Sequence, residues 1–128
     1  MGAQVVVAII TRDHKVLLVR RRQPEGALSW VFPGGGVEPG ETEIRAVERE
    51  VCEEVGIHVH AHTRLGQRIH PDSGRLLAYW VCEPLSGNGA VVDIDELDLL
   101  RWVTPSEAIA MTATSLYPPV RLHLEQFG

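Results

Sequence analysis

The sequence has few cysteines, no long apolar run and no basic segment, and each absence excludes a class of protein. Cys52 and Cys82 occur without a Cys-x-x-Cys pair, so we expect reduced thiols rather than a disulfide framework or a zinc site. No apolar run approaches the roughly 18 residues of a membrane span. Arg12 interrupts the N-terminal apolar run before it could act as a signal sequence, so we expect a cytoplasmic protein without membrane contact.

Net charge and chain length indicate which partners and how many domains to expect. Twelve Lys and Arg residues against seventeen Asp and Glu residues leave a net charge of −5, which argues against binding to a nucleic-acid polymer. The chain has 128 residues, of which 45% are hydrophobic and 23% charged, as in an ordinary globular protein. No change in composition marks a boundary, so we expect residues 1–128 to form a single domain.

Three glutamates, Glu50, Glu53 and Glu54, are spaced i, i+3 and i+4 within a segment that is expected to be helical. This spacing places all three on one helix face, with neighbouring Cβ atoms about 5–6 Å apart. Like charges at that distance repel one another unless a cation neutralises them. Carboxylate oxygens suit Mg²⁺ and Mn²⁺, so a metal site is one interpretation, and a solvated acidic helix face is the other.

The residues around the triad favour the metal site. They follow the pattern Gly-x5-Glu-x7-Arg-Glu-(apolar)-x-Glu-Glu-x-Gly-(apolar), which resembles the Nudix box of the MutT-like Nudix hydrolases. The matching positions are Gly35, Glu41, Arg49, Glu50, Val51, Glu53, Glu54, Gly56 and Ile57. The resemblance implies the Nudix fold, an α/β/α sandwich with a central mixed sheet, for the whole chain.

The segment that carries the triad also has signals for its own boundaries. Thr42 is a suitable N-cap and Gly56 a suitable C′ residue for the helix between them. Ile44, Val47, Val51 and Val55 recur every three or four residues and predict an apolar stripe beside the glutamates. The helix can therefore bury one flank on a sheet while its carboxylates line the edge of a cleft.

The residues before the helix are expected to form a loop whose backbone can approach a ligand closely, because Gly34, Gly35 and Gly36 follow Pro33. Arg49 lies next to the triad and could orient a carboxylate through a bidentate pair.

The rest of the chain reads as alternating strands and short helices, which favours an α/β sandwich. Residues 4–11 form a nearly continuous β-branched run, typical of a strand buried on both faces. Further strands are expected over residues 15–22, 28–32, 57–69 (one strand or a bent pair), 76–83 and 99–103, with a loop over 23–27 and helices over 105–111 and 119–127.

Two further groups are candidates for the site, each with a plainer alternative. Glu96 precedes Trp102 within an acidic stretch, and in the Nudix family an acidic residue before a late Trp often reaches the metal site or helps to activate water. The alternative is a loop that is acidic for solubility. Among the arginines at 20–22, strand alternation allows one or two to face a cleft, and Arg20 is the preferred phosphate contact. Arg22 reads equally well as solvent-facing.

His58, His60 and His62 alternate and therefore share one strand face. No carboxylate or cysteine accompanies them at ligand spacing, so we expect an exposed face with Val59 and Ala61 turned inward.

The resemblance implies a mechanism as well as a fold. Nudix hydrolases cleave a nucleoside diphosphate that is linked to another group. The family pattern carries metal binding to Gly35, Glu50, Glu53 and Glu54, with Mg²⁺ as the cofactor and Mn²⁺ as a substitute. It implies catalytic roles for Arg49, Glu50, Glu53 and Glu96, with Glu50 or Glu96 taking the proton from water. We expect Arg20, Gly34, Gly35 and Glu41 at the substrate, Glu41 by supporting the loop.

The main functional hypothesis is a nucleoside triphosphate pyrophosphohydrolase that converts a (d)NTP, or an oxidised dNTP such as 8-oxo-dGTP, to a monophosphate and pyrophosphate. The alternative is an ADP-ribose or nucleotide-sugar pyrophosphatase, since a proline near Pro71 accompanies that activity in the family. An alternative of another class is a non-catalytic nucleotide-sensing module, which the intact glutamates disfavour. The partner is a small nucleotide in each case. Family members are frequently dimers, so a homodimer is compatible with the resemblance.

Overall fold

The computed structural model describes residues 2–22 and 28–127, so the loop expected over residues 23–27 lies outside the described part. The strands are β1 (Val5–Arg12), β2 (Lys15–Arg22), β3 (Leu28–Val31), β4 (Gly34–Gly36), β5 (His58–Ile69), β6 (Leu76–Ser86) and β7 (Leu97–Val103). The helices are α1 (Glu43–Val55), α2 (Pro105–Met111) and α3 (Pro118–Phe127).

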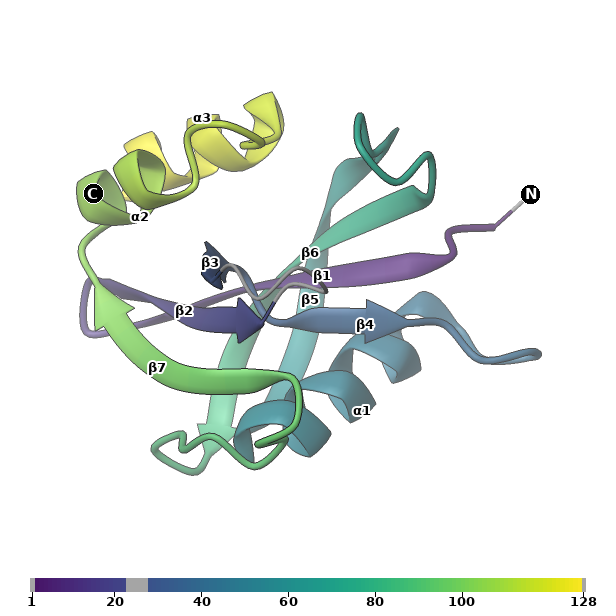
Figure 1. The fold of residues 1–128 in the computed structure, drawn as a ribbon, viewed down its shortest axis with the longest axis horizontal. Coiled ribbons are helices and arrows are strands. Elements are labelled where there is room, and N and C mark those ends of the chain that lie inside the picture. The colour runs from purple at the N-terminus through teal and green to yellow at the C-terminus, as the bar shows by residue number, and fades with distance from the viewer. Residues whose placement is uncertain (1, 23–27, 128) are drawn as a thin grey trace.

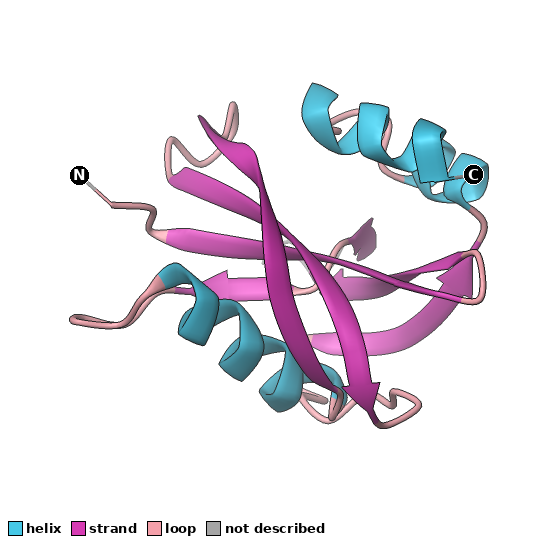
Figure 2. Cartoon of the chain, turned by 180° about the vertical axis from the view of Figure 1, so that it is seen from behind, coloured by secondary structure: helices cyan, strands magenta, loops and turns pink. Residues whose placement is uncertain are grey.

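A mixed sheet separates the helices into two layers. Strands β1 and β6 pair in parallel, whereas β1 with β2, β1 with β4, β2 with β3, β2 with β7 and β5 with β6 pair antiparallel. Helix α1 lies on one side of the strands, and α2 and α3 lie together on the other (Figures 1 and 2). This arrangement confirms the α/β sandwich.

Strand β1 is buried on both faces because it lies between two hydrophobic cores. Val6, Ala8 and Ile10 point into the core under α1, whereas Ile9 points into the core under α2 and α3, where it meets Leu124. All five side chains are completely buried. A strand covered on both sides needs apolar residues at every position, which explains the continuous run seen in the sequence.

Helix α1 begins and ends as the sequence predicts. The Thr42 side chain accepts a hydrogen bond from the Arg45 amide, and Gly56 ends the helix in the left-handed conformation at φ 70°. The predicted apolar stripe is wrong at one position, since Ile44 is 39% exposed. Ile44 lies in the first turn, whereas the buried flank runs along the rest of the helix. That flank consists of Ala46, Val47, Val51, Glu54 and Val55.

The glycine segment is a strand rather than the expected loop. Gly34–Gly36 forms β4, which pairs antiparallel with Val5–Val7 of β1. A Cβ at Gly34 would lie 2.2 Å from the Val6 carbonyl oxygen, so no larger residue fits against β1 there. Glycine at position 34 therefore allows close contact between β4 and β1.

The second half of the sheet departs from expectation mainly at strand ends. Residues 58–69 form one strand with three register shifts against β6, rather than a bent pair. His58, His60 and His62 are exposed while Val59 and Ala61 are buried, which confirms the predicted orientation. Strand β6 runs on to Ser86 and β7 starts at Leu97, each beyond its predicted limit. Among the described residues, no helix is long and apolar enough to cross a membrane.

Candidate active site

A cleft of about 560 Å³ lies where β4, the second half of α1 and the segment before β7 meet. Two glutamates from α1, a pair of β4 glycines, several arginines and the acidic residues around position 95 line it. These residues are Gly35, Gly36, Glu50, Glu54, Arg21, Arg22, Arg75, Asp93, Asp95 and Glu96, together with Val5. The cleft therefore brings most of the sequence-predicted carboxylates together.

Glu54 is the most deeply buried carboxylate of the cleft. Its side chain is 4% exposed, accepts a hydrogen bond of 3.3 Å from the Gly34 amide and lies 3.9 Å from the Arg21 guanidinium. The pKa of Glu54 is raised to about 8, mainly by burial and also by the neighbouring Glu50 and Glu96, against the opposing effect of the Gly34 and Arg21 contacts. A buried carboxylate with a raised pKa is typical of sites that bind a cation or exchange a proton.

Glu50 lies directly against the backbone of β4. A Cβ at Gly35 would lie 2.3 Å from the Glu50 carboxylate, so glycine at this position lets the acid and the strand backbone meet. Burial raises the pKa of Glu50, the Glu53 and Glu96 charges raise it further, and the Arg49 contact lowers it. The carboxylate and the Gly35 backbone thus form one face of the cleft.

Arg49 links the carboxylates of the motif to one another. Its Nε and Nη2 donate to the two oxygens of Glu41 at 2.8 and 2.9 Å, and its Nη1 donates to Glu50 at 2.8 Å and Glu53 at 3.2 Å. Nη2 also donates to the Gly36 carbonyl at 2.8 Å. The Arg49 hydrogen bond is the main reason why the pKa of Glu41 falls to about 2. The expected bidentate pair therefore exists, and its partner is Glu41.

The triad does not act as one uniform face. Glu54 is buried, Glu50 is largely buried with 16% of its side chain exposed, and Glu53 lies on the rim with 59% exposed. Glu41 contacts Arg49 and the Glu38 amide rather than lining the cleft.

Glu96 reaches the cleft from the segment before β7. Its carboxylate pairs with Arg21 at 2.7 Å, and its backbone carbonyl accepts from the Arg22 amide at 2.8 Å. The preceding segment is tied to the end of α1, since the Val92 and Asp93 amides donate to the Glu54 carbonyl. This contact satisfies a carbonyl that the helix end leaves open and brings the acidic segment to the triad.

Arg20, like Glu41, is a predicted site residue that does not line the cleft. Its guanidinium makes a bidentate pair with Asp98, at 2.9 and 2.7 Å, and lies 5.8 Å from the Trp30 ring centre. Arg21 occupies the place expected for Arg20. Strand β2 has buried positions on both faces from Val16 to Val19, and its pairing with β7 shifts register between residues 20 and 21. Alternation alone could therefore not identify the arginine that faces the site.

The donors of the cleft fit a divalent cation in kind. Glu50 and Glu54 are crowded and largely buried carboxylates, which a hard cation would stabilise in their charged form. Among the described residues, no three acidic, histidine or cysteine side chains already converge as a metal-holding group. Arg49 and Arg21 hold three of the carboxylates through ion pairs, so these contacts compete with a cation for the same oxygens.

A second hollow of about 210 Å³ adjoins the cleft and shares Val5, Arg21 and Gly35 with it. Its wall is mainly apolar and comes from β1, β3, β6 and the connection between α2 and α3. The aromatic side chains of Trp30, Tyr79 and Tyr117 line this wall together with Arg68, and the sequence did not single out Arg68 or Tyr79. Arg68 gave no signal in the sequence, because nothing there distinguishes it from Arg64, the other arginine of the same long strand.

Comparison with known proteins agrees with this geometry. The family model described as "NUDIX domain" matches residues 1–123. The CTP pyrophosphohydrolase of Escherichia coli strain K12 is 37% identical over 109 residues, which cover 83% of this chain and 78% of that protein. The 8-oxo-dGTP diphosphatase of the same strain is 35% identical over 89 residues, covering 66% of this chain and 68% of that protein.

A solved structure shows the same architecture. The solution structure of the E. coli ORF135 protein superposes with a TM-score of 0.72 at 31% identity, covering 98% of this chain and 87% of that one. Family model, relatives and structure agree with the motif at residues 35–57, and members of this family generally need divalent metal ions. The chain therefore belongs to the Nudix family of hydrolases.

Proposed function

We propose that this hydrolase is a Mg²⁺-dependent nucleoside triphosphate pyrophosphohydrolase, which converts a (d)NTP or an oxidised dNTP to a nucleoside monophosphate and pyrophosphate. The observation that carries the proposal is the junction of two hollows. An acidic cleft suited to cation-bound phosphates opens beside a largely apolar cavity suited to a base, and the two share Arg21 and Gly35. Two relatives whose names state such activities support this choice.

The residues that would hold Mg²⁺, or Mn²⁺ in its place, are Glu50, Glu53 and Glu54 with the Gly35 carbonyl. When bound, the ion supplies charge neutralisation for the phosphates and lowers the pKa of a coordinated water. Arg49 restrains Glu50 and Glu53, and the Glu50 carboxylate lies against β4 at Gly35.

Glu50 is the preferred proton acceptor for the attacking water, with Glu96 as the alternative. Burial has moved the pKa of Glu50 upward, toward the pH at which a general base works best. Arg49 holds Oε1 of Glu50, while Oε2 lies toward the position where Gly35 lacks a side chain. Glu96 is 56% exposed and paired with Arg21, and therefore has to release that arginine before it can act.

The phosphate contacts come from β2 and β4. Arg21, rather than Arg20, lines both hollows and can bind phosphate oxygens once they compete with Glu96 for its guanidinium. The backbone of Gly34 and Gly35 provides close approach. Glu41 supports the site through Arg49 without touching the substrate.

The bond that is cut provides the test. The protein is incubated with Mg²⁺ and a panel of dNTPs, 8-oxo-dGTP and ADP-ribose in ¹⁸O-water, and the products are separated by chromatography and mass spectrometry. We expect monophosphate and pyrophosphate from triphosphates, with the label in one of those two products. Labelled orthophosphate from a triphosphate would rule out attack at an internal phosphorus, and a strong preference for ADP-ribose would replace the proposed substrate class.

A further inference from the structure

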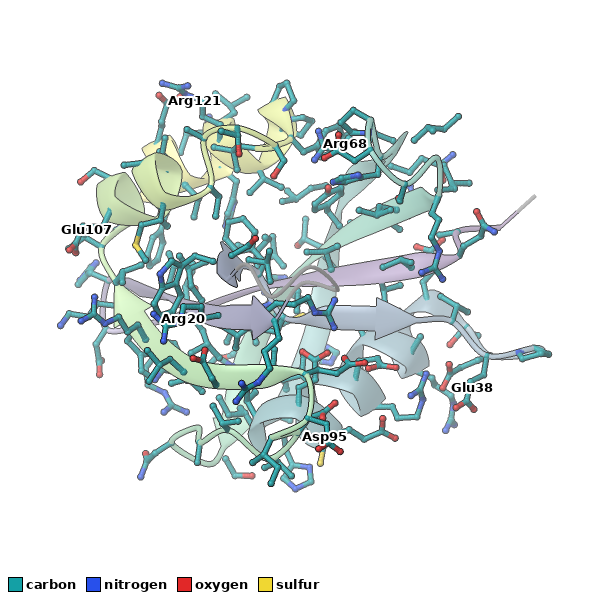
Figure 3. The ribbon with its side chains drawn as sticks, in the orientation of Figure 1. Arg20, Glu38, Arg68, Asp95, Glu107 and Arg121 are labelled. Carbon is teal, nitrogen blue, oxygen red and sulfur yellow. The ribbon has the colours of Figure 1, made fainter. Side chains whose placement is uncertain are left out.

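The cavity beside the cleft has a mainly apolar wall that contains Arg68, in addition to the Arg21 that it shares with the cleft. Val5, Val7, Leu77 and Leu116 supply aliphatic surface, and Arg68 reaches the cavity from β5. In Figure 3, Arg68 and Asp95 lie on opposite sides of the strands, so Arg68 belongs to the cavity and is remote from the acidic segment. A charged group at a cavity wall has to be held by specific partners, because burying part of it costs free energy.

Those partners fix the orientation of the Arg68 guanidinium. Nε donates to the Tyr79 hydroxyl at 3.0 Å, and Nη2 donates to the Ser115 carbonyl. The guanidinium also lies 5.6 Å from the Tyr79 ring centre and 5.4 Å from that of Tyr117. These contacts use two of its five N–H donors, so three are without a partner among the described residues.

Glycine makes this arrangement fit. Tyr117 stacks on Tyr79 at 4.7 Å and donates its hydroxyl to the Gln67 carbonyl at 3.0 Å. A Cβ at Gly66 would lie 2.6 Å from that hydroxyl, and Gly66 has φ +140° at a register shift of β5. The strand, both tyrosines and the α2–α3 connection thus hold Arg68 in a preorganised position.

The other polar groups of the cavity reinforce its donor character. The Nδ1 atom of His70 faces the amides of Asp72 and Ser73, which puts its proton on Nε2 as a further donor. The Tyr79 hydroxyl accepts from Arg68 and is left to donate to a ligand, whereas the Thr112 hydroxyl donates to the Ala108 carbonyl and is left to accept. Among the described lining residues there is no Asp, Glu, Asn or Gln. The cavity therefore matches acceptor atoms on a base better than amino groups.

We propose that Arg68 is a specificity-determining residue that selects a nucleobase presenting two adjacent acceptor atoms. This inference rests on the proposed function, since it assumes that the base of a nucleotide enters the cavity. Cytosine offers O2 and N3, and guanine offers O6 and N7, the pair that an arginine fork binds in DNA. Adenine and uracil present no adjacent acceptor pair. In 8-oxoguanine, N7 carries a hydrogen, so its O6–N7 edge is disfavoured.

Matched pairs of nucleotides test the inference on the unmodified protein. dUTP differs from dCTP in having N3–H and O4 in place of N3 and the amino group. 7-Deaza-dGTP differs from dGTP in lacking the N7 acceptor. We expect kcat/KM to be about tenfold or more higher for the better member of at least one pair, in line with the discrimination of a bidentate arginine contact. Whether dCTP or dGTP shows the larger ratio identifies the base. Ratios within about twofold in both pairs would overturn the proposal.

Substitution assigns the preference to Arg68. Arg68→Lys keeps the charge but loses the planar fork, so the ratio within the discriminating pair is expected to fall toward one. Arg64→Lys is the matched control, because Arg64 is on the same strand but pairs with Glu43 outside the cavity. Both kcat/KM values of a pair are measured on the same preparation. A lower folded fraction in a variant therefore affects both values equally and leaves their ratio unchanged. An unchanged ratio in Arg68→Lys would contradict the assignment.

Failure of the inference and failure of the proposed function give different results. Turnover of all triphosphates without base preference would overturn the inference alone. Turnover of none would refute the proposed function, and titration calorimetry with dCMP, dUMP, dGMP and dAMP would then still measure the preference of the cavity directly. Equal affinity for the four monophosphates would overturn the inference in that case as well.

Discussion

The acidic cleft and the adjoining cavity are built in opposite ways. The triad glutamates at the cleft come from adjacent turns of one helix, and Arg49 beside them holds Glu50 and Glu53. The cavity draws its wall from six strands and the α2–α3 connection, and Arg68 in this wall is held by a carbonyl and a hydroxyl. The cleft is therefore encoded by spacing along the chain, whereas the cavity is encoded by how distant segments pack.

The same contrast appears in the electrostatics. Like charges crowd in the cleft, and burial raises the pKa of both Glu50 and Glu54. In the cavity, Arg68 lies beside the aromatic rings of Tyr79 and Tyr117 within a mainly apolar wall. Under the proposed function, the cleft would bind the cation and the phosphates, and the cavity would recognise the uncharged base. Substitutions in the cleft should therefore alter the rate of hydrolysis, and substitutions in the cavity should alter the preference among bases.

The largest expected effect is a loss of turnover without a change in base preference. Glu53→Gln and Glu54→Gln should each reduce turnover at least about a hundredfold, because they remove charge that holds the cation at the phosphates. The ratio between dCTP and dUTP should stay unchanged. Steady-state kinetics with Mg²⁺ measure both quantities. Glu48→Gln is the control, since Glu48 is on the same helix but outside the cleft. Activity within a few-fold of wild type in both triad variants would show that this face is not the metal site.

A smaller effect concerns stability and pH without added metal. The pKa of Glu54 is about 8 in the folded protein against an ordinary value of 4.5, so the folded state binds more protons between these limits. Stability should therefore fall as pH rises from about 4.5 to 8, by at least about 2 kcal/mol across the window. Urea unfolding in EDTA at several pH values measures this. Glu54→Gln should flatten the dependence, and an equally steep curve in that variant would assign it to another group.

The smallest effect is expected outside both hollows. Glu41→Gln weakens the bidentate support of Arg49, so Glu50 and Glu53 lose some restraint and kcat should fall by roughly tenfold or less. Base preference should not change. Steady-state kinetics of Glu41→Gln, measured in parallel with Glu53→Gln and Glu54→Gln, compare the losses in kcat. A loss as large as that of Glu54→Gln would mean that Glu41 contributes directly to the reaction.

The helix that carries the triad glutamates could be predicted from the sequence. Helix limits follow from Thr42 and Gly56, and carboxylate spacing follows from the helical repeat, so both are local properties. The two-sided burial of β1 was likewise readable, because a strand between two cores leaves no position for a polar side chain. The role of Ile44 was misread, because periodicity does not show where a helix leaves the surface on which it packs.

The sequence by itself determined the family motif, the main helix and the kind of chemistry, because these depend on residues close together in the chain. Tertiary structure decided that Gly34–Gly36 is a strand, since only the approach of β1 reveals the missing space for a Cβ. It also decided that Arg21 rather than Arg20 faces the cleft, through a register shift that alternation does not contain. Arg68 meets the α2–α3 connection 47 residues later in the chain, and a contact of that separation is set by packing alone.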